Sequence, residues 1–351
     1  TWRWMLGLEI IPAIAYFLLL LRIPESPRWL VLQHRMTEAR TVMAKLLPEQ
    51  EISKQIEEIQ ATVKEKPEPV LKRLRSLFQP SLKLALTIGI MIAIVQQITG
   101  INAIYFYAPS IFEQSGVGTD AAFAQAVLVG VVNVIFTLLA MLLIDRIGRK
   151  PLLLIGLTGI MVSMLLCSYG FNNASYQLTN TAAQEIVLND DSGELNLESL
   201  QGLVDKTFTS DVEFKQAANK ALGERVARSQ QSVLIKASIN IDPYVVLIGI
   251  LGFVASFALS LGPVMWVLLP EIFPNNLRGV AMAVTGMINS LSSFIVQFVF
   301  PWELNTLGAA STFAIYGGFA AVSLVLVFWM LPETRGKSLE ELEIELRGRT
   351  A

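Results

Sequence analysis

Long apolar stretches separated by polar segments dominate the 351-residue chain. A helix needs about 20 apolar residues to cross a bilayer, and seven stretches approach or exceed that length. They are Trp4–Leu21, Leu84–Phe112, Ala121–Ile144, Leu152–Phe171, Tyr244–Leu269, Val280–Phe300 and Thr312–Leu331. The pattern predicts an all-α polytopic membrane protein whose termini lie on opposite sides of the bilayer, because the number of spans is odd.

Composition agrees with a lipid environment. Hydrophobic residues make up 53% of the chain and charged residues only 16%, whereas about a quarter of a soluble protein is charged. The net charge of −2 gives no reason to expect a nucleic-acid partner. The single cysteine, Cys167, lies in a predicted span and excludes an internal disulfide.

Charge in the connections predicts the orientation, because short cytoplasmic loops carry an excess of Lys and Arg. Residues 22–83 hold 12 basic against 8 acidic residues, and residues 145–150 hold three basic residues against Asp145. Residues 172–240 hold 9 acidic against 6 basic residues. We therefore expect the amino end outside and the carboxyl end in the cytoplasm.

The spans divide the chain into segments. We expect a first membrane helix over 1–22, a cytoplasmic linker with amphipathic helices over 23–83, a six-helix bundle over 84–331 and a cytoplasmic tail over 332–351. The bundle carries an extracytoplasmic insert, 172–240, with expected helices near 197–204 and 212–226. A small solvated cap is the simplest interpretation of this insert.

Three carboxamides interrupt the second span, at Gln96, Gln97 and Asn102. Amides in a membrane face a neighbouring helix or a water-filled cavity, because they cost free energy in hydrocarbon without partners. At about 100° per residue, these three side chains point in different directions on a straight helix. Their convergence on one ligand requires unwinding at Thr99-Gly100, and Pro109 predicts a second break.

A faint repeat links the two ends of the chain. Pro24-Glu25-Ser26 follows the first span and Pro332-Glu333-Thr334 follows the last. Two such copies, separated by five spans, indicate a duplicated six-span unit, and transporters hold substrate between such repeats. The chain also begins at Thr1 rather than Met. We therefore expect a fragment with the last span of one unit and all six spans of the next.

Five motifs in this order resemble the sugar porter family of the major facilitator superfamily, and specifically its proton-coupled xylose and glucose transporters. They are PESPRWL (24–30), QQITGINAIYFYAP (96–109), DRIGRKP (145–151), GPVMWVLLPEIFPNNLRG (262–279) and PETRGKS (332–338). The resemblance implies a twelve-span transporter, with seven of its helices in this chain, in which two bundles rock about a central sugar site.

The resemblance also implies the sugar contacts. Carboxamides match a sugar hydroxyl because they both donate and accept hydrogen bonds, and an indole can cover a sugar's C–H face. For Asn133, an interhelical hydrogen bond is an equal alternative. Ser290 stands where the family often has a Trp, which predicts a wider pocket. The implied contacts are Gln96, Gln97, Asn102, Asn133, Trp266 and Asn289.

Charged residues gather at the cytoplasmic ends of the spans. We hypothesise that they pair across helices and hold the inner side closed in the outward-facing state; orientation by positive charge alone explains the basic residues but not the acidic ones. The members of this cytoplasmic charge network are Glu25, Arg28, Asp145, Arg146, Arg149, Glu271, Arg278, Glu333 and Arg335.

Glu9 is the one carboxylate well inside a predicted span. It lies roughly 20 Å along the helix from Arg22, in the outer half of the bilayer. A desolvated carboxyl binds protons more readily, which suits a proton carrier. A glutamate in a wet vestibule near the interface is an equal alternative.

The predicted function is transport of a hexose or pentose across the cell membrane by alternating access, with a proton as coupling ion. A facilitative uniporter and a non-transporting sugar receptor on the same fold are the alternatives. An enzyme is not expected, because His34 is the only histidine and lies in a loop, and no metalloprotease or nucleophile-elbow motif is present. No cofactor and no metal are expected.

Overall fold

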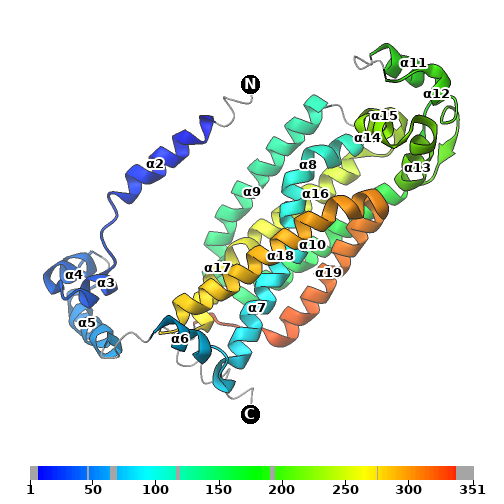
Figure 1. The fold of residues 1–351 in the computed structure, drawn as a ribbon. Helices are drawn as coiled ribbons and strands as arrows, with labels where there is room; N and C mark the ends of the chain where they lie inside the picture. The colour runs from blue at the N-terminus through cyan, green and yellow to red at the C-terminus, as the bar shows by residue number, and fades with distance from the viewer. Residues whose placement is uncertain are drawn as a thin grey trace. The chain divides into compact units, whose positions relative to one another are not determined.

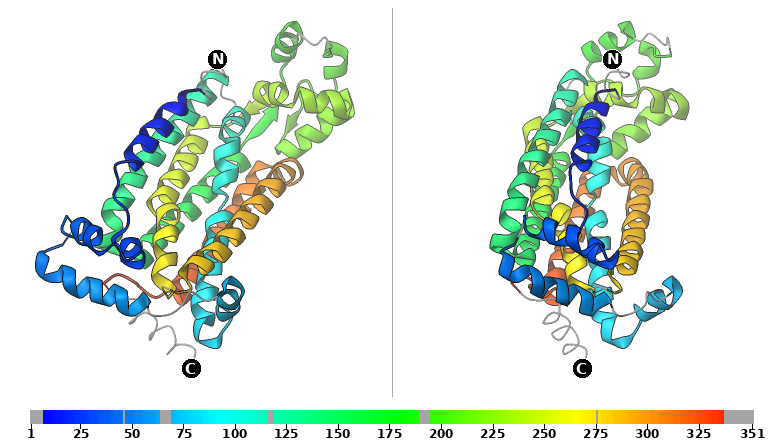
Figure 2. Two further views of the ribbon diagram at one scale, coloured as in Figure 1. Left: turned by 60° about the vertical axis from the view of Figure 1, so that its left-hand side comes forward. Right: turned by 90° about the vertical axis from the view of Figure 1, so that its left-hand side faces the viewer.

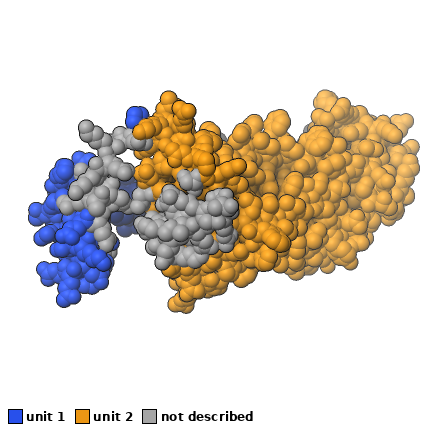
Figure 3. All heavy atoms as spheres, turned by 90° about the horizontal axis from the view of Figure 1, so that it is seen from below, with its two compact units in different colours: residues 1–69 blue, residues 70–351 orange. Residues whose placement is uncertain are grey.

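A computed structural model of the chain describes residues 7–45, 47–63, 69–115, 119–189, 194–274 and 276–336. The chain divides into two compact units, residues 1–69 and residues 70–351 (Figure 3).

The first unit contains one apolar helix, α2, and three further helices in its described part. They are α2 (Ile10–Leu20), α3 (Pro27–Leu32), α4 (Met36–Met43) and α5 (Glu49–Val63). Helices α3 to α5 bury a small core that includes Leu30, Val31 and Ile56. Amphipathic helices were expected over this stretch, and the structure has them.

In the described residues, the helix of the first predicted span is shorter than a membrane crossing, and the first residues of that span, 4–6, lie outside the described part of the structure. Helix α2 has 11 residues, all exposed, whereas a bilayer needs about 20. Six helices in the described part of the chain are long and apolar enough to cross a membrane. The expected count of seven spans, and of seven helices out of twelve, is therefore not confirmed.

The second unit is a bundle of long helices built from those six candidate spans (Figures 1 and 2). Two of these spans each consist of two helices separated by a break, α7 with α8 and α16 with α17. The helices are α6 (Val70–Ser76), a 3-10 turn (Pro80–Leu82), α7 (Lys83–Ile98), α8 (Ile101–Gln114), α9 (Thr119–Ile147), α10 (Arg149–Asn172), α16 (Pro243–Leu259), α17 (Leu261–Ile272), α18 (Arg278–Thr306) and α19 (Gly308–Met330).

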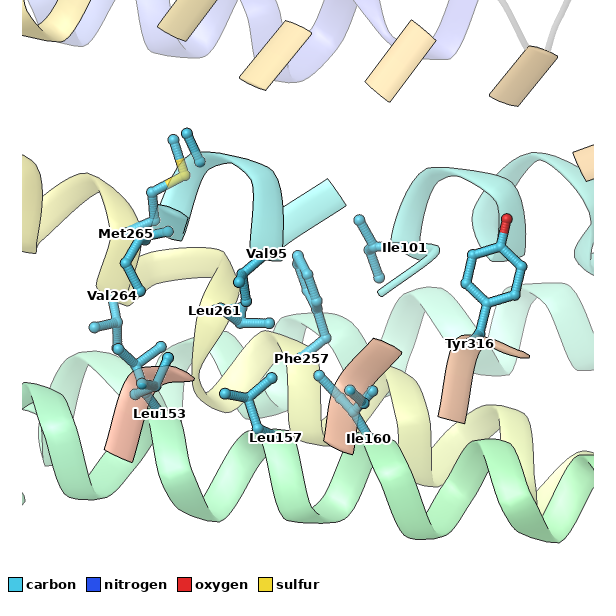
Figure 4. Packing of buried hydrophobic residues seen from close by; sticks show 14 of the residues in the cluster. Val95, Ile101, Leu153, Leu157, Ile160, Phe257, Leu261, Val264, Met265 and Tyr316 are labelled. Carbon is cyan, nitrogen blue, oxygen red and sulfur yellow. The ribbon is translucent and has the colours of Figure 1, made fainter. Parts of the chain in front are cut away.

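Helix α10 lies at the centre of this packing, between α16 and α19. Small residues let α10 and α16 approach closely, as in other membrane helix pairs. A Cβ on Gly249 would come within 2.4 Å of the Cys167 sulfur, and one on Gly156 within 1.8 Å of the Ser260 hydroxyl. Figure 4 shows Leu157 of α10 below Leu261 and Val95, so this core supports the broken helix α7–α8.

The insert is a small folded domain rather than a purely helical cap, so the all-α expectation is wrong here. Its three short antiparallel strands lie in the order β2-β1-β3, with Tyr176 paired to Phe208 and to Ile239. The elements are β1 (Ser175–Gln177), α11 (Asn180–Leu188), α12 (Leu197–Leu200), β2 (Thr207–Phe208), α13 (Asp211–Leu222), α14 (Glu224–Ser229), α15 (Gln231–Ser238) and β3 (Ile239–Asn240).

The insert has a core of its own, separate from that of the bundle, formed around Tyr176, Leu203 and Phe214. Burial and the nearby Asp211 carboxylate raise the pKa of Tyr176 above its usual range. The insert lies at one end of the bundle and α6 at the other (Figures 1 and 2). Helices α12 and α13 occur near the two predicted helices, but the sheet was not predicted.

Candidate functional site

The second predicted span is broken where the amide geometry requires it. Helix α7 ends at Ile98, α8 begins at Ile101, and Gly100 between them has φ +89°, in the left-handed region that favours glycine. A Cβ at Gly100 would also come within 2.7 Å of the Tyr316 ring. The predicted break at Thr99-Gly100 is confirmed.

The predicted second break at Pro109 is wrong. Helix α8 continues through Pro109 to Gln114. A proline in a helix removes one backbone hydrogen bond, here to the carbonyl of Tyr105. Helix α8 packs against α9, α15, α16 and α18, and these contacts keep it helical despite that loss.

The break brings together carboxamides from three helices. Asn289 of α18 donates from Nδ2 to Gln96 Oε1 at 2.7 Å and to the Ala93 carbonyl at 2.9 Å. Gln97 donates from Nε2 to Asn289 Oδ1 at 3.1 Å. Gln96 in turn donates to the Leu261 carbonyl at 3.1 Å, at the start of α17. All three amides are buried, with 5–7% of their surface exposed.

Asn102 extends the network from the first turn of α8. Its Nδ2 donates to Gln97 Oε1 at 2.9 Å and to the Ser293 hydroxyl at 2.7 Å. Gln297, one turn further along α18, donates to the same hydroxyl at 2.8 Å. Asn102 is only partly buried, so this end of the network opens toward solvent.

A cavity of about 550 Å³ opens beside this network. No residue that lines it carries a charge, and Phe294 and Phe298 on its edge expose 61% and 73% of their surface. The two rings stack with centroids 5.8 Å apart. We call this space the amide cavity; its lining residues are Gln97, Asn102, Asn289, Ser290, Ser293, Phe294, Gln297 and Phe298.

Four of the six expected sugar contacts therefore come together: Gln97, Asn102 and Asn289 line the cavity, and Gln96 is bonded behind them. Asn133 on α9 is partly buried, and Trp266 on α17 is 50% exposed; neither lines the amide cavity. Their role as sugar contacts stays a prediction.

The prediction from the sequence included Asn289 but missed Ser293 and Gln297, which continue its polar stripe along α18. Asn289, Ser293 and Gln297 recur every four residues and so lie on one helix face, and Phe294 and Phe298 follow the same spacing. This periodicity was the available signal. Ser290 does line the cavity, where a tryptophan would narrow it.

The arrangement suits an uncharged ligand with several hydroxyl groups. Each carboxamide and each serine hydroxyl both donates and accepts hydrogen bonds, as a sugar hydroxyl does. Aromatic faces at the edge can cover the apolar C–H face of such a ligand. Without a charged group in the lining, the amide cavity offers no counterion to an ionic substrate.

Replacing Gly100 with Ala is expected to destabilise the protein by about 1–3 kcal/mol, because a side chain at positive φ is strained and would overlap the Tyr316 ring. The thermal midpoint of the protein in detergent measures this. Gly130→Ala on α9 is the matched control, because a Cβ there meets nothing within 4 Å. Equal midpoints for the two variants would contradict the strain at Gly100.

At the end of the bundle away from the insert, acidic side chains link α9, α10, α17 and the segment that follows α19. Arg149 donates to Glu271 Oε1 at 2.7 Å and also pairs with Asp145 at 3.1 Å. Thr334 donates to the other oxygen of Glu271 at 2.7 Å. Arg149 and Glu271 are largely buried, with 12% and 27% of their side chains exposed.

Glu333 caps the start of α10. Its carboxylate accepts hydrogen bonds from the backbone N–H groups of Arg149 at 3.1 Å and Lys150 at 3.0 Å, where a helix N-terminus favours negative charge. Gly148, with φ +101°, permits this approach, because a Cβ there would lie 2.7 Å from the carboxylate. The predicted pairing across helices thus exists for Glu271 with Arg149, whereas Glu333 bonds backbone N–H groups rather than a charged side chain.

The other predicted members of the cytoplasmic charge network have the following positions. Arg146 is exposed, and Arg335 contributes its backbone N–H to Glu333 at 2.9 Å. Arg278 is partly buried. Glu25 is exposed, as is Glu9, directly before α2; both belong to the first unit. The side chain of Arg28 lies outside the described part of the structure.

Comparison with known proteins gives consistent matches. The profile of the family described as "Sugar (and other) transporter" matches residues 1–188 and 229–346. The arabinose-proton symporter of Bacillus subtilis (strain 168) is 33% identical over 343 residues, 97% of this chain and 59% of that protein. The D-xylose-proton symporter of Escherichia coli (strain K12) is 30% identical over 97% of this chain and 56% of that protein.

A solved structure is similar to this chain as well. The proton:xylose symporter XylE of the major facilitator superfamily, bound to 6-bromo-6-deoxy-D-glucose, superposes with a TM-score of 0.67 and 29% identity, covering 98% of this chain and 59% of that one. The chain spans about 60% of the length of the curated relatives it matches. These matches run along nearly the whole length of this chain. They do not confirm the expectation of a fragment. By the match of its family profile, the chain belongs to the family of sugar (and other) transporters.

Proposed function

We propose that the protein moves a monosaccharide across a membrane by alternating access. The observation that carries this proposal is the amide network at the broken helix α7–α8. Gln97, Asn102 and Asn289 meet there beside a cavity with no charged lining residue. Broken helices at the substrate site are a recurrent feature of transporters, and uncharged donor–acceptor groups fit a sugar better than an ion.

The substrate class is a hexose or pentose. Relatives of the chain are named for arabinose and xylose symport with protons and for glucose transport, and proton coupling is proposed here on that basis. Ser290 in the amide cavity leaves more room than a large ring, which favours a hexose over a pentose.

The proposed setting is a multi-pass protein of the cell membrane. The excess of basic residues in 22–83 and 145–150 supports a cytoplasmic location for these segments and for the tail over 332–351. The acidic insert over 172–240 is then outside. In this arrangement the amide cavity lies in the six-helix bundle over 84–331, between the insert at the outer end and the Glu271 pairs at the inner end.

A second candidate is a sugar receptor that does not transport, because the insert is a folded domain with its own core and offers a surface for a partner. Uptake of radiolabelled D-xylose and D-glucose into proteoliposomes holding the full-length protein separates the two. A transporter fills the vesicles, whereas a receptor binds the sugar without uptake.

Replacing Gln97 with Ala is expected to weaken sugar binding roughly three- to tenfold. The lost hydrogen bonds to an uncharged hydroxyl are worth about 0.5–1.5 kcal/mol. Calorimetry on the purified protein measures the change in Kd. Gln125→Ala, on α9 and away from the amide cavity, is the control and should bind as the parent does. Unchanged binding in Gln97→Ala would remove this residue from the site.

A further inference from the structure

A second hollow, of about 490 Å³, lies between the insert and the end of α18, a size within the roughly 300–1,000 Å³ usual for ligand sites. Helix α13 lies close to this end of α18 (Figure 1). We call this hollow the insert pocket. Its lining residues are Phe214, Lys215, Ala218, Asn219, Ala227, Arg228, Gln231, Leu234, Ile235, Pro301, Trp302, Asn305 and Thr306.

The insert pocket shares no lining residue with the amide cavity. The lining residues that come from α13 and α14 all lie within residues 189–228, which the family profile does not match. The pocket is therefore a feature of this chain's insert rather than part of the site described above.

The floor of the insert pocket is apolar and its rim is polar. Phe214, Leu234 and Ile235 expose 1–2% of their surface and form the floor. Trp302, 58% exposed, presents an indole at the rim. Three carboxamides, from Asn219, Gln231 and Asn305, are also part of the lining. An aromatic ring with several carboxamides suits a hydroxylated, uncharged ligand, as the phenyl rings and carboxamides of the amide cavity do.

The charges of the insert pocket are already neutralised. Lys215 pairs with Asp211 at 2.7 Å, with 11% and 9% of the two side chains exposed, and also donates to the Leu304 carbonyl at 3.1 Å. Arg228 pairs with Glu224 at 2.7 Å. Both cations in the lining have an acidic partner beside them, so the pocket presents no net positive charge to an anion.

The walls of the pocket are bonded to each other. Lys215 joins α13 to the last turns of α18, and Gln231 of α15 donates to Asn305 of α18 at 3.5 Å. A pocket whose two walls are held in this way is formed before a ligand arrives, which lowers the ordering cost of binding.

We propose that the insert pocket is an accessory carbohydrate site, in which an uncharged sugar lies with its C–H face against the Trp302 indole and its hydroxyls toward Asn219, Gln231 and Asn305. The proposal rests on the proposed function only for the choice of probe.

The test uses the full chain in phosphatidylcholine nanodiscs with radiolabelled D-glucose as the probe. The Gln97→Ala substitution weakens sugar binding in the amide cavity. In this background, saturable glucose binding is expected to persist at the insert pocket. Adding Trp302→Ala is expected to weaken that remaining binding at least tenfold, and adding Asn305→Ala severalfold. Trp329→Ala is the matched control, because Trp329 is 76% exposed on α19 and does not line the pocket.

Equal glucose binding in the Trp302→Ala and Trp329→Ala proteins would overturn the proposal, as would the absence of saturable binding in the Gln97→Ala protein. If Gln97→Ala leaves binding unchanged while Trp302→Ala abolishes it, the proposed function of the amide cavity fails and the accessory site stands.

Discussion

Replacing Glu271 with Lys is expected to shift the protein at least tenfold toward an inward-open state. Glu271 accepts one hydrogen bond from Arg149 and one from Thr334, each 2.7 Å long. A hydrogen bond to a charged group contributes about 1.5–3 kcal/mol, and 1.4 kcal/mol is a factor of ten. The substitution removes both bonds and places a second cation beside Arg149, so the inner ends of the helices should separate more readily.

Thiol labelling measures this shift cleanly. The one native cysteine, Cys167, is fully buried, so a cysteine introduced as Ser290→Cys in the amide cavity provides the accessible thiol. In the Glu271→Lys protein, labelling of this cysteine from the cytoplasmic side should rise, and its labelling from the outer side should fall. A permeant and an impermeant maleimide distinguish the two directions.

Two variants control the experiment. Exchanging the charges as Arg149→Glu with Glu271→Arg should restore much of the parent's labelling, because the ion pair is reversed and kept. Glu224→Lys breaks an Arg–Glu pair of the same length that is 74% and 70% exposed, and exposed pairs contribute little. If labelling in Glu271→Lys matches that in Glu224→Lys, the pairs do not hold the inner side closed.

The six long spans could be predicted from the sequence because their signal is length and composition alone. The break at Thr99-Gly100 was also predictable, from the angles between Gln96, Gln97 and Asn102. That argument used helix geometry and the expectation that the three amides converge on one ligand. In the structure, these amides and that of Asn289 form hydrogen bonds with one another at 2.7–3.3 Å.

The rest depends on packing, which a single sequence does not display. Pro109 weakens a helix locally, but contacts with four neighbouring helices keep α8 intact. The strands of the insert have only two or three residues each, too few for an alternating pattern to emerge. Ser293 and Gln297 were overlooked because a polar residue every four positions in an otherwise apolar span also fits interhelical bonding.

Neutralising Glu9 as Glu9→Gln is expected to abolish accumulation of sugar against a gradient, if Glu9 carries the coupled proton. Glutamine keeps the size and hydrogen bonding of the side chain but cannot titrate. Exchange of sugar down its own gradient should persist, because exchange needs only the sugar contacts and the rocking motion. Uptake into proteoliposomes with and without an imposed proton gradient, together with counterflow of preloaded D-xylose, measures both activities.

The position of Glu9 makes this a sharp test of coupling. Glu9 is exposed directly before the apolar helix α2, where both a proton carrier and a solvated vestibule residue are chemically reasonable. Glu51→Gln, an exposed carboxylate on the amphipathic helix α5, is the matched control and should accumulate sugar as the parent does. Full proton-driven accumulation by the Glu9→Gln protein would exclude the carrier role, whereas loss of accumulation together with loss of counterflow would indicate damage to the transport cycle itself. Only the split between the two activities, lost accumulation with preserved counterflow, assigns the proton to Glu9.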